Sequence, residues 1–296
     1  MDHKEFVSGF DRTRLAHMQE RQDRAGLVHL FGHAFLIAAL ALYVGLSLPF
    51  WYLAMVPLGI ALVFLFTLEH EATHKTPFRS EWLNEAAGHV SGYLILQPFL
   101  WFRYFHLAHH RFTNIPDKDP ELLAGHKPEG WAAYVWHVTG FPYWIGMTAQ
   151  LVGNALGRDP GDYVPKSARA RVKREARRML GVYGLLVLTF LVTDLLLWIW
   201  VLPLVFGMPF LRLYLLAEHG RCAFVANMFE NTRTTYTNRI VRFLAWNMPY
   251  HVEHHAIPNV PFHQLPELHK EMKGHHKVIA ESYTAFTKEY LQELTR

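Results

Sequence analysis

Histidines gathered in three short windows are the residues of this chain whose types and spacing could do chemistry. The windows read HEATH, HLAHH and HVEHH, and they hold eight of the 20 histidines: His70, His74, His106, His109, His110, His251, His254 and His255. Residues three or four apart on a helix lie on one face, so each window presents two or three imidazoles in one direction. Neutral imidazole binds iron, zinc or copper. Because eight ligands are too many for one ion, the simplest interpretation is two ions with about four imidazoles each.

A membrane zinc protease is the competing interpretation of the first window. Residues 70–74 also match HExxH, in which two histidines bind zinc and the glutamate, here Glu71, is the general base. One zinc ion needs only one further protein ligand. The other two windows would then have no role, which makes the protease the weaker alternative.

The elements that must position these windows are predicted to be membrane helices. The 296 residues are 51% apolar and only 18% charged, whereas soluble domains carry about 25% charged residues. Residues 25–68 contain no Asp, Glu, Lys or Arg, and residues 179–211 contain only Asp194. One span needs roughly 20 apolar residues, so each block is long enough for two. We therefore predict two helical hairpins, 27–47 with 50–68 and 179–197 with 199–217.

The distribution of charge predicts the orientation of these hairpins. Segment 158–178 holds eight basic residues against three acidic ones, directly before the second hairpin, while the links inside the hairpins carry no Lys or Arg. By the positive-inside rule the basic loop is cytoplasmic and the links are outside. The N-terminal segment 1–26, the C-terminal part 218–296 and the histidine windows then lie on the cytoplasmic side.

Two further apolar stretches, 86–102 and 131–157, are predicted to be interfacial helices. Both are interrupted by Gly, Pro and polar residues and are rich in aromatic residues, which favour the bilayer boundary. A span at either stretch would put the windows on opposite sides of the membrane. A non-catalytic metal transporter, a third alternative, should instead place its ligands within the spans near mid-bilayer. Without repeats or Gly/Ser linkers, the chain is predicted to be one all-α domain, 1–296, with a helical cytoplasmic cap.

At these residues the chain resembles the membrane-bound fatty acid desaturase family. The resemblance covers roughly 30–275 and depends on HEATH at 70–74, HLAHHRFTNIPDKDPE at 106–121 and NMPYHVEHHAIPNVPFHQLPELHK at 247–270. It implies a di-iron centre held by histidine, O2 as the oxidant, and electrons from outside the chain. The eight window histidines are the implied ligands, and His219 in AEHG matches the position of a ninth.

The resemblance also implies an activity and its partners. We expect a desaturase that introduces a double bond into a fatty-acyl or lipid chain. A hydroxylase or monooxygenase of a lipid, hydrocarbon or carotenoid on the same scaffold stays open. The partners would be the lipid substrate and a ferredoxin or cytochrome with its reductase, and no nucleic acid. We expect an integral protein of a bacterial cytoplasmic membrane. The acyl channel is predicted to be lined by the first hairpin and the aromatic stretch 99–105.

Residues that orient the ligands are expected near them in sequence. A ligating imidazole usually donates its second N–H to a carboxylate, carbonyl or water. The candidates for this role are Glu71, Asp117, Asp119, Glu218, Asn247 and Glu253. The histidines that follow the third window without its spacing are predicted to be surface residues: His263, His269, His275 and His276.

Overall fold

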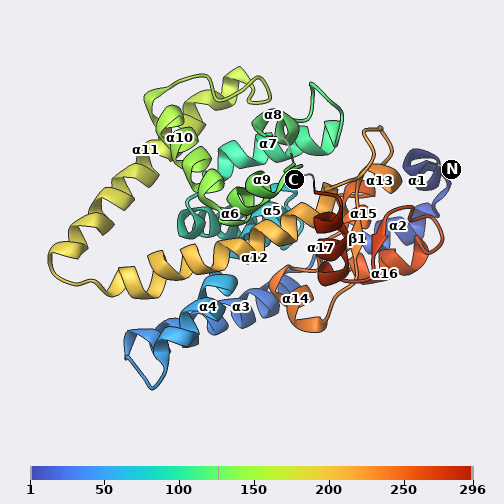
Figure 1. Ribbon diagram of the computed structural model, residues 1–296. Coiled ribbons are helices and arrows are strands. Elements are labelled where there is room, and N and C mark those ends of the chain that lie inside the picture. Colours follow the sequence, from blue (N-terminus) through green and yellow to red (C-terminus); the bar gives the residue numbers. More distant parts are fainter. Residues whose placement is uncertain (1, 126, 295–296) are drawn as a thin grey trace.

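The computed structural model describes residues 2–125 and 127–294, and it is mostly helical (Figure 1). The first half contains α1 (His3–Gly9), α2 (Arg12–Met18), α3 (Asp23–Gly45), α4 (Trp51–Val63), α5 (Leu65–Thr73), α6 (Glu81–Ile95), α7 (Phe99–Phe112), α8 (Pro120–Ala124), α9 (Trp131–Val138) and α10 (Phe141–Leu156). The second half contains α11 (Lys166–Leu188), the short helices Thr189–Leu191 and Leu197–Val201, α12 (Leu202–His219), α13 (Met228–Asn231), β1 (Thr234–Thr235), α14 (Arg239–Leu244), α15 (His251–Ala256), α16 (Leu265–Glu271), β2 (Ile279–Ala280) and α17 (Tyr283–Gln292).

Among the described residues, three helical stretches are long and apolar enough to cross a membrane: Arg12–Gly45, Trp51–Thr73 and Leu197–His219. They correspond to the predicted first hairpin and to the second half of the second hairpin. The predicted fourth span is not among them, because α11 begins inside the basic segment and only its second half is apolar. Four spans are therefore not confirmed.

The turn of the second hairpin lies earlier than predicted. Helix ends at Leu191 and begins again at Leu195, so the predicted boundary near 197–199 is wrong. Asp194 explains the difference. Its backbone carbonyl accepts a hydrogen bond from the amide of Leu197, and its side chain accepts one from the Trp198 indole at 2.9 Å. Asp194 directly precedes the resumed helix, and the link therefore covers 192–194.

Helices α4 and α12 cross with their backbones in contact. A Cβ added to Gly59 would lie 1.9 Å from the carbonyl oxygen of Pro203, and one added to Gly207 would lie 2.2 Å from the carbonyl carbon of Gly59. Small residues allow this close approach between membrane helices. The contact brings together the helix that leads into His70 and His74 and the helix that ends in His219.

Each predicted interfacial stretch is broken into two helices. The first break follows Leu96, whose φ is 62°, and separates α6 from α7. The second is at Gly140, with φ 76°, between α9 and α10. The longest of these four helices has 16 residues, fewer than the roughly 20 that a span needs. None of these four helices is among the three candidate spans.

The predicted N-terminal and C-terminal parts pack against each other. Both hairpin links point to the left in Figure 1, whereas α1, α2 and α13 to α17 gather at the other end. The backbone N–H of His3 donates to the Asn227 side chain at 3.2 Å, and Arg14 pairs with Glu271. Strands β1 and β2 form a short parallel pair with Thr234 opposite Ile279. These segments surround the end of the molecule where the histidines lie.

The close crossing of α4 and α12 predicts the effect of a larger side chain. Gly207→Leu should force the two helices apart, since overpacking typically costs about 1–3 kcal/mol. We expect a lower Tm in detergent and less bound metal per chain. Gly184→Leu on α11 is the matched control, because a Cβ at Gly184 meets no atom within 4 Å. Equal Tm and metal content in both variants would contradict this packing.

Candidate metal centre

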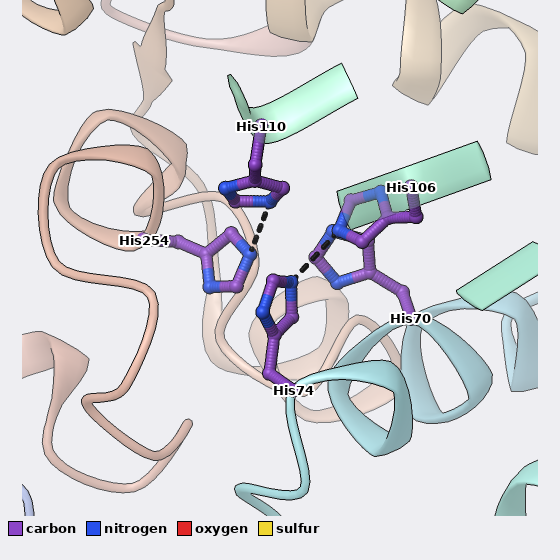
Figure 2. Close-up of side chains that lie close together, drawn as sticks. All are labelled: His70, His74, His106, His110 and His254. Carbon is purple, nitrogen blue, oxygen red and sulfur yellow. Dashed lines mark hydrogen bonds between the residues drawn. The ribbon is translucent and has the colours of Figure 1, made fainter. Parts of the chain in front are cut away.

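Five histidines from three helices form the first imidazole group. His70 and His74 come from the end of α5, His106 and His110 from α7, and His254 from α15. One nitrogen of each lies within 4.8 Å of the others, and Figure 2 shows the rings directed at a common centre. The Nε2 atoms of His74 and His106 are 2.8 Å apart, and those of His110 and His254 are 3.2 Å apart.

Four histidines form a second group beside the first. His109, His219 and His255 offer nitrogens within 4.8 Å of one another. The Nε2 atom of His219 lies 3.2 Å from that of His109 and 3.1 Å from that of His251. The two groups are adjacent, because the rings of His110 and His255 stack with centroids 4.0 Å apart.

The division between the groups follows helical periodicity. In each HxxHH window the first and fifth positions join one group and the fourth joins the other: His106 and His110 against His109, and His251 and His255 against His254. Residues four apart on a helix differ in direction by about 40°, whereas neighbours differ by about 100°. Two successive histidines therefore serve two different centres.

The donor atoms fit metal ions. At a metal–nitrogen bond length of about 2.1 Å, two ligands at right angles have their nitrogens about 3 Å apart, close to the separations of 2.8–3.2 Å found here. Both ring nitrogens of His70 and Nε2 of His255 are buried without a hydrogen-bond partner. An all-imidazole set suits iron, zinc or copper, so the residues present fit iron without selecting it.

Burial keeps these imidazoles in the form that binds metal. Except for the half-buried His74 and His110, the nine side chains are at most 4% exposed. Burial, reinforced by the neighbouring histidines, holds the pKa of His106, His254 and His255 well below the usual value. Their rings are therefore neutral at physiological pH, with a lone pair available for a metal.

Asp119 orients His109. Its Oδ1 lies 2.9 Å from Nδ1 of His109, and the carboxylate also accepts hydrogen bonds from the amides of Asn114 and Glu121. As the N-cap of α8 it is held rigidly. Burial alone would lower the pKa of His109, but the carboxylates of Glu121 and Asp119 raise it. The same charge would favour the Nδ1–H tautomer, which leaves Nε2 for a metal.

Glu71 and Glu218 lie beside ligand candidates at longer range. Glu71 Oε1 is 3.6 Å from His254 Nδ1, and Glu218 Oε1 is 3.5 Å from His251 Nδ1. Glu71 is also fixed by the Thr76 hydroxyl at 2.9 Å and by the Phe262 amide at 3.1 Å. The Glu71 carboxylate is thus engaged by Thr76 and Phe262, and His70 and His74 belong to a group of five histidines. Neither observation supports the zinc-protease interpretation.

Two further orienting groups were missed by sequence reasoning. The backbone carbonyl of Asn231 lies 3.1 Å from His219 Nδ1, and the Thr113 hydroxyl lies 3.2 Å from His255 Nδ1. Thr113 follows the second window by three residues, so its proximity to that window was visible in the sequence. A backbone carbonyl in a loop has no sequence signal, and Asn231 could not have been found.

Asp117 and Asn247 are not orienting residues, contrary to prediction. Asp117 is exposed, in a left-handed turn conformation with φ 62°, and contacts no window histidine. The Asn247 amide donates to the carbonyl of Phe262 at 3.0 Å and so fixes a turn. Both residues lie in left-handed turns beside the window helices, so nearness in sequence did not bring their side chains to a histidine.

Glu253 also differs from its predicted role. Two positions after His251 on α15, it points away from both imidazole groups and accepts hydrogen bonds from His269, from His276 at 2.6 Å and from Thr234 at 2.6 Å. Burial alone would raise its pKa, but the hydrogen bonds from His269 and His276 hold it at about 2. His269 and His276, predicted as surface residues, therefore tie the C-terminal part to the third window.

A chain of long apolar helices with two adjacent imidazole groups at their ends has the architecture of a membrane metalloenzyme. Residues 53–289 match the model of the fatty acid desaturase family, and the chain belongs to this family. The predicted family is thereby confirmed.

Several relatives are similar to parts of the chain. It is 35% identical over 74 residues to an sn-1 oleoyl-lipid 12-desaturase of Picosynechococcus, covering 25% of this chain and 20% of the relative. A protein of the same name in Arthrospira platensis is 23% identical over 75% of this chain and 69% of its own length. The Delta(12) fatty acid desaturase fat-2 of Caenorhabditis elegans is 36% identical over 31% of this chain and 24% of its own. Except for the Arthrospira protein, the matched regions cover well under half of these relatives.

The contact between Asp119 and His109 predicts a test of the metal centre. Asp119→Asn keeps the helix cap but removes the negative charge, and loss of such an orienting partner typically weakens metal binding 10–100-fold. Metal retained during dialysis against a chelator should fall accordingly. Asp117→Asn, two residues away and exposed, should bind metal as the unaltered protein does. If the two variants retain metal equally, Asp119 does not orient a ligand.

Proposed function

We propose that this protein is an O2-dependent di-iron desaturase that introduces a double bond into an acyl chain of a membrane lipid. The observation that carries the proposal is the pair of adjacent imidazole groups in a chain of the fatty acid desaturase family. The relatives are named as desaturases, which favours a double bond over a hydroxyl group as the product. Hydroxylation on the same scaffold is the second candidate.

We assign nine histidines as iron ligands. One iron would be held by His70, His74, His106, His110 and His254, and the other by His109, His219, His251 and His255. When bound, two iron ions supply the activation of O2 and the removal of hydrogen from an unactivated carbon chain. The protein contributes the neutral imidazoles, the partners that orient them, and burial that excludes water from the reaction.

An external electron donor follows from the balance of the reaction. Forming the double bond removes two hydrogen atoms, that is two electrons and two protons, from the acyl chain. The reduction of O2 to two water molecules consumes four electrons and four protons. The remaining two electrons and two protons must be supplied separately. We propose a ferredoxin or cytochrome with its reductase as the electron donor, docking on the cytoplasmic side.

We also propose a topology. The chain would be one domain in a bacterial cytoplasmic membrane, with a fourth span that includes the apolar half of α11 and the short helix Thr189–Leu191. The two hairpin links, 46–50 and 192–194, would lie outside, and the metal centre and both termini inside. The basic first half of α11 supports this orientation, as does the gathering of α1 and α17 at the end of the molecule opposite the links.

Replacement of a ligand tests the activity. His254→Ala should remove at least one iron per chain and abolish double-bond formation, measured by metal analysis and by mass spectrometry of lipids from an expressing host. His263→Ala is the control, because His263 is half-buried with no hydrogen-bond partner and belongs to neither group. Full activity of the His254 variant would end the proposal. One zinc per chain and peptide hydrolysis would favour the protease.

Cysteine labelling tests the topology. In a Cys222→Ser background, Ser47→Cys and Thr193→Cys place a thiol in each hairpin link, and Lys118→Cys places one beside the metal centre; all three positions are exposed. A membrane-impermeant maleimide should label positions 47 and 193 in intact cells and position 118 only after lysis. Labelling of 47 and 118 from the same side would refute the arrangement.

A further inference from the structure

An apolar cavity of about 900 Å³ lies between α4, α12, α14 and α17. Its less exposed lining is formed by Ile60, Phe64, Leu213, Tyr214 and Leu244, and the more exposed Phe210 also lines it. The first hairpin, predicted to line the acyl channel, contributes to this cavity. No residue of 99–105 lines it, because Leu100, Trp101 and Phe102 pack against α11. The volume is within the range of about 300–1,000 Å³ usual for ligand sites.

The cavity and the metal centre are connected through α12. Tyr214 and Phe210 precede His219 on α12 by five and nine residues, or about 7 and 13 Å along the helix. The rings of Tyr214 and Phe64 contact each other with centroids 5.1 Å apart. The Tyr214 hydroxyl is buried next to Glu218, which in turn faces His251. An occupant of the cavity therefore passes within about two helical turns of the iron ligands.

The polar lining of this cavity comes almost entirely from one face of α17. Thr284, Lys288 and Gln292 follow one another at intervals of four residues, so they line up along that face. Lys288 is exposed and pairs with no carboxylate in the described part of the chain. A cavity that is apolar inside and has one unpaired cation at its edge matches an amphiphile with an anionic head group.

The rim of the cavity suits a ligand that arrives from the bilayer. Ile240 of α14 is 72% exposed and Trp131 of α9 is 46% exposed, and both line the cavity. Exposed apolar side chains around an opening are typical of a surface in contact with lipid. A lysine at this level can extend its stem along the apolar wall and place its ammonium group among the lipid head groups.

We propose that Lys288, flanked by Thr284 and Gln292, binds the phosphate of a membrane glycerophospholipid while one acyl chain of that lipid occupies the cavity. The proposal rests on the proposed function, since it names the lipid class presented to the metal centre. A phospholipid is favoured over a free fatty acid because a lateral rim of apolar residues leaves room for the second chain in the bilayer, whereas a free acid has no second chain to place.

Paired lipids test this assignment. The purified, iron-loaded protein with its electron donor would be reconstituted in nanodiscs that contain either phosphatidylglycerol or an uncharged galactolipid, with identical acyl chains. Lys288→Gln should slow desaturation of phosphatidylglycerol by about threefold to fivefold, the size expected for one exposed charge pair, and leave the galactolipid unaffected. Lys288→Arg should retain the preference. Lys273→Gln, at an exposed lysine outside the cavity, is the control.

A binding measurement separates this proposal from the proposed function. Phosphatidylglycerol with a photoreactive acyl chain should label the α12 peptide that contains Phe210 and Tyr214, in protein without metal, and Lys288→Gln should reduce the labelling. Labelling elsewhere, or labelling unaffected by Lys288→Gln, would overturn the assignment even if desaturation occurs. Stronger Lys288-dependent labelling by photoreactive free oleate would replace the phospholipid by a free acid. Lys288-dependent labelling by phosphatidylglycerol without desaturation of any lipid would refute only the activity.

Discussion

The convergence of nine imidazoles in a buried space is the constraint on which the rest of this structure depends. Rings whose nitrogens approach within 2.8–3.2 Å cannot all be protonated, and burial keeps the pKa of His106, His254 and His255 low. A metal ion is the natural partner for so many unprotonated nitrogens in one place. The relative positions of the helices that carry these histidines must therefore be closely fixed. The backbone contact between Gly59 and Gly207 is one way in which they are fixed.

A set of fixed polar groups keeps the rings in place. Asp119 does so through a rigid helix cap, Asn231 through a backbone carbonyl, and Thr113 through a hydroxyl. Glu253 acts indirectly. It lies within the third window and accepts hydrogen bonds from His269 and His276 of the C-terminal part. The C-terminal part is thus built into the wall of the metal centre.

The same arrangement connects the metal centre to the membrane. α12 ends in His219 and its preceding two turns line the apolar cavity, so one helix belongs to both. α17 forms one wall of the cavity and supplies its only cation, Lys288, in the part of the chain that the structure describes. α12 is therefore the structural link between the candidate metal centre and the cavity proposed to bind the lipid.

Local spacing in the sequence determined much of this site. The three windows predicted eight of the nine converging histidines, the apolar blocks predicted the long helices, and the motifs around the windows predicted the family, which is confirmed. These predictions succeed because helical periodicity acts over four or five residues. Helical periodicity could not predict that Asp119 rather than Asp117 contacts His109, because both residues follow the helix and lie in or after a turn.

Only tertiary packing decided which histidine serves which group. The windows could be divided by periodicity, but whether His254 would meet His110 or His219 depends on how α15 lies against α7 and α12. The Asn231 carbonyl, the inward-facing His276 and the cavity edge at Lys288 also arise from segments distant in sequence. No local pattern encodes such contacts, because their geometry is set by helix packing over the whole chain.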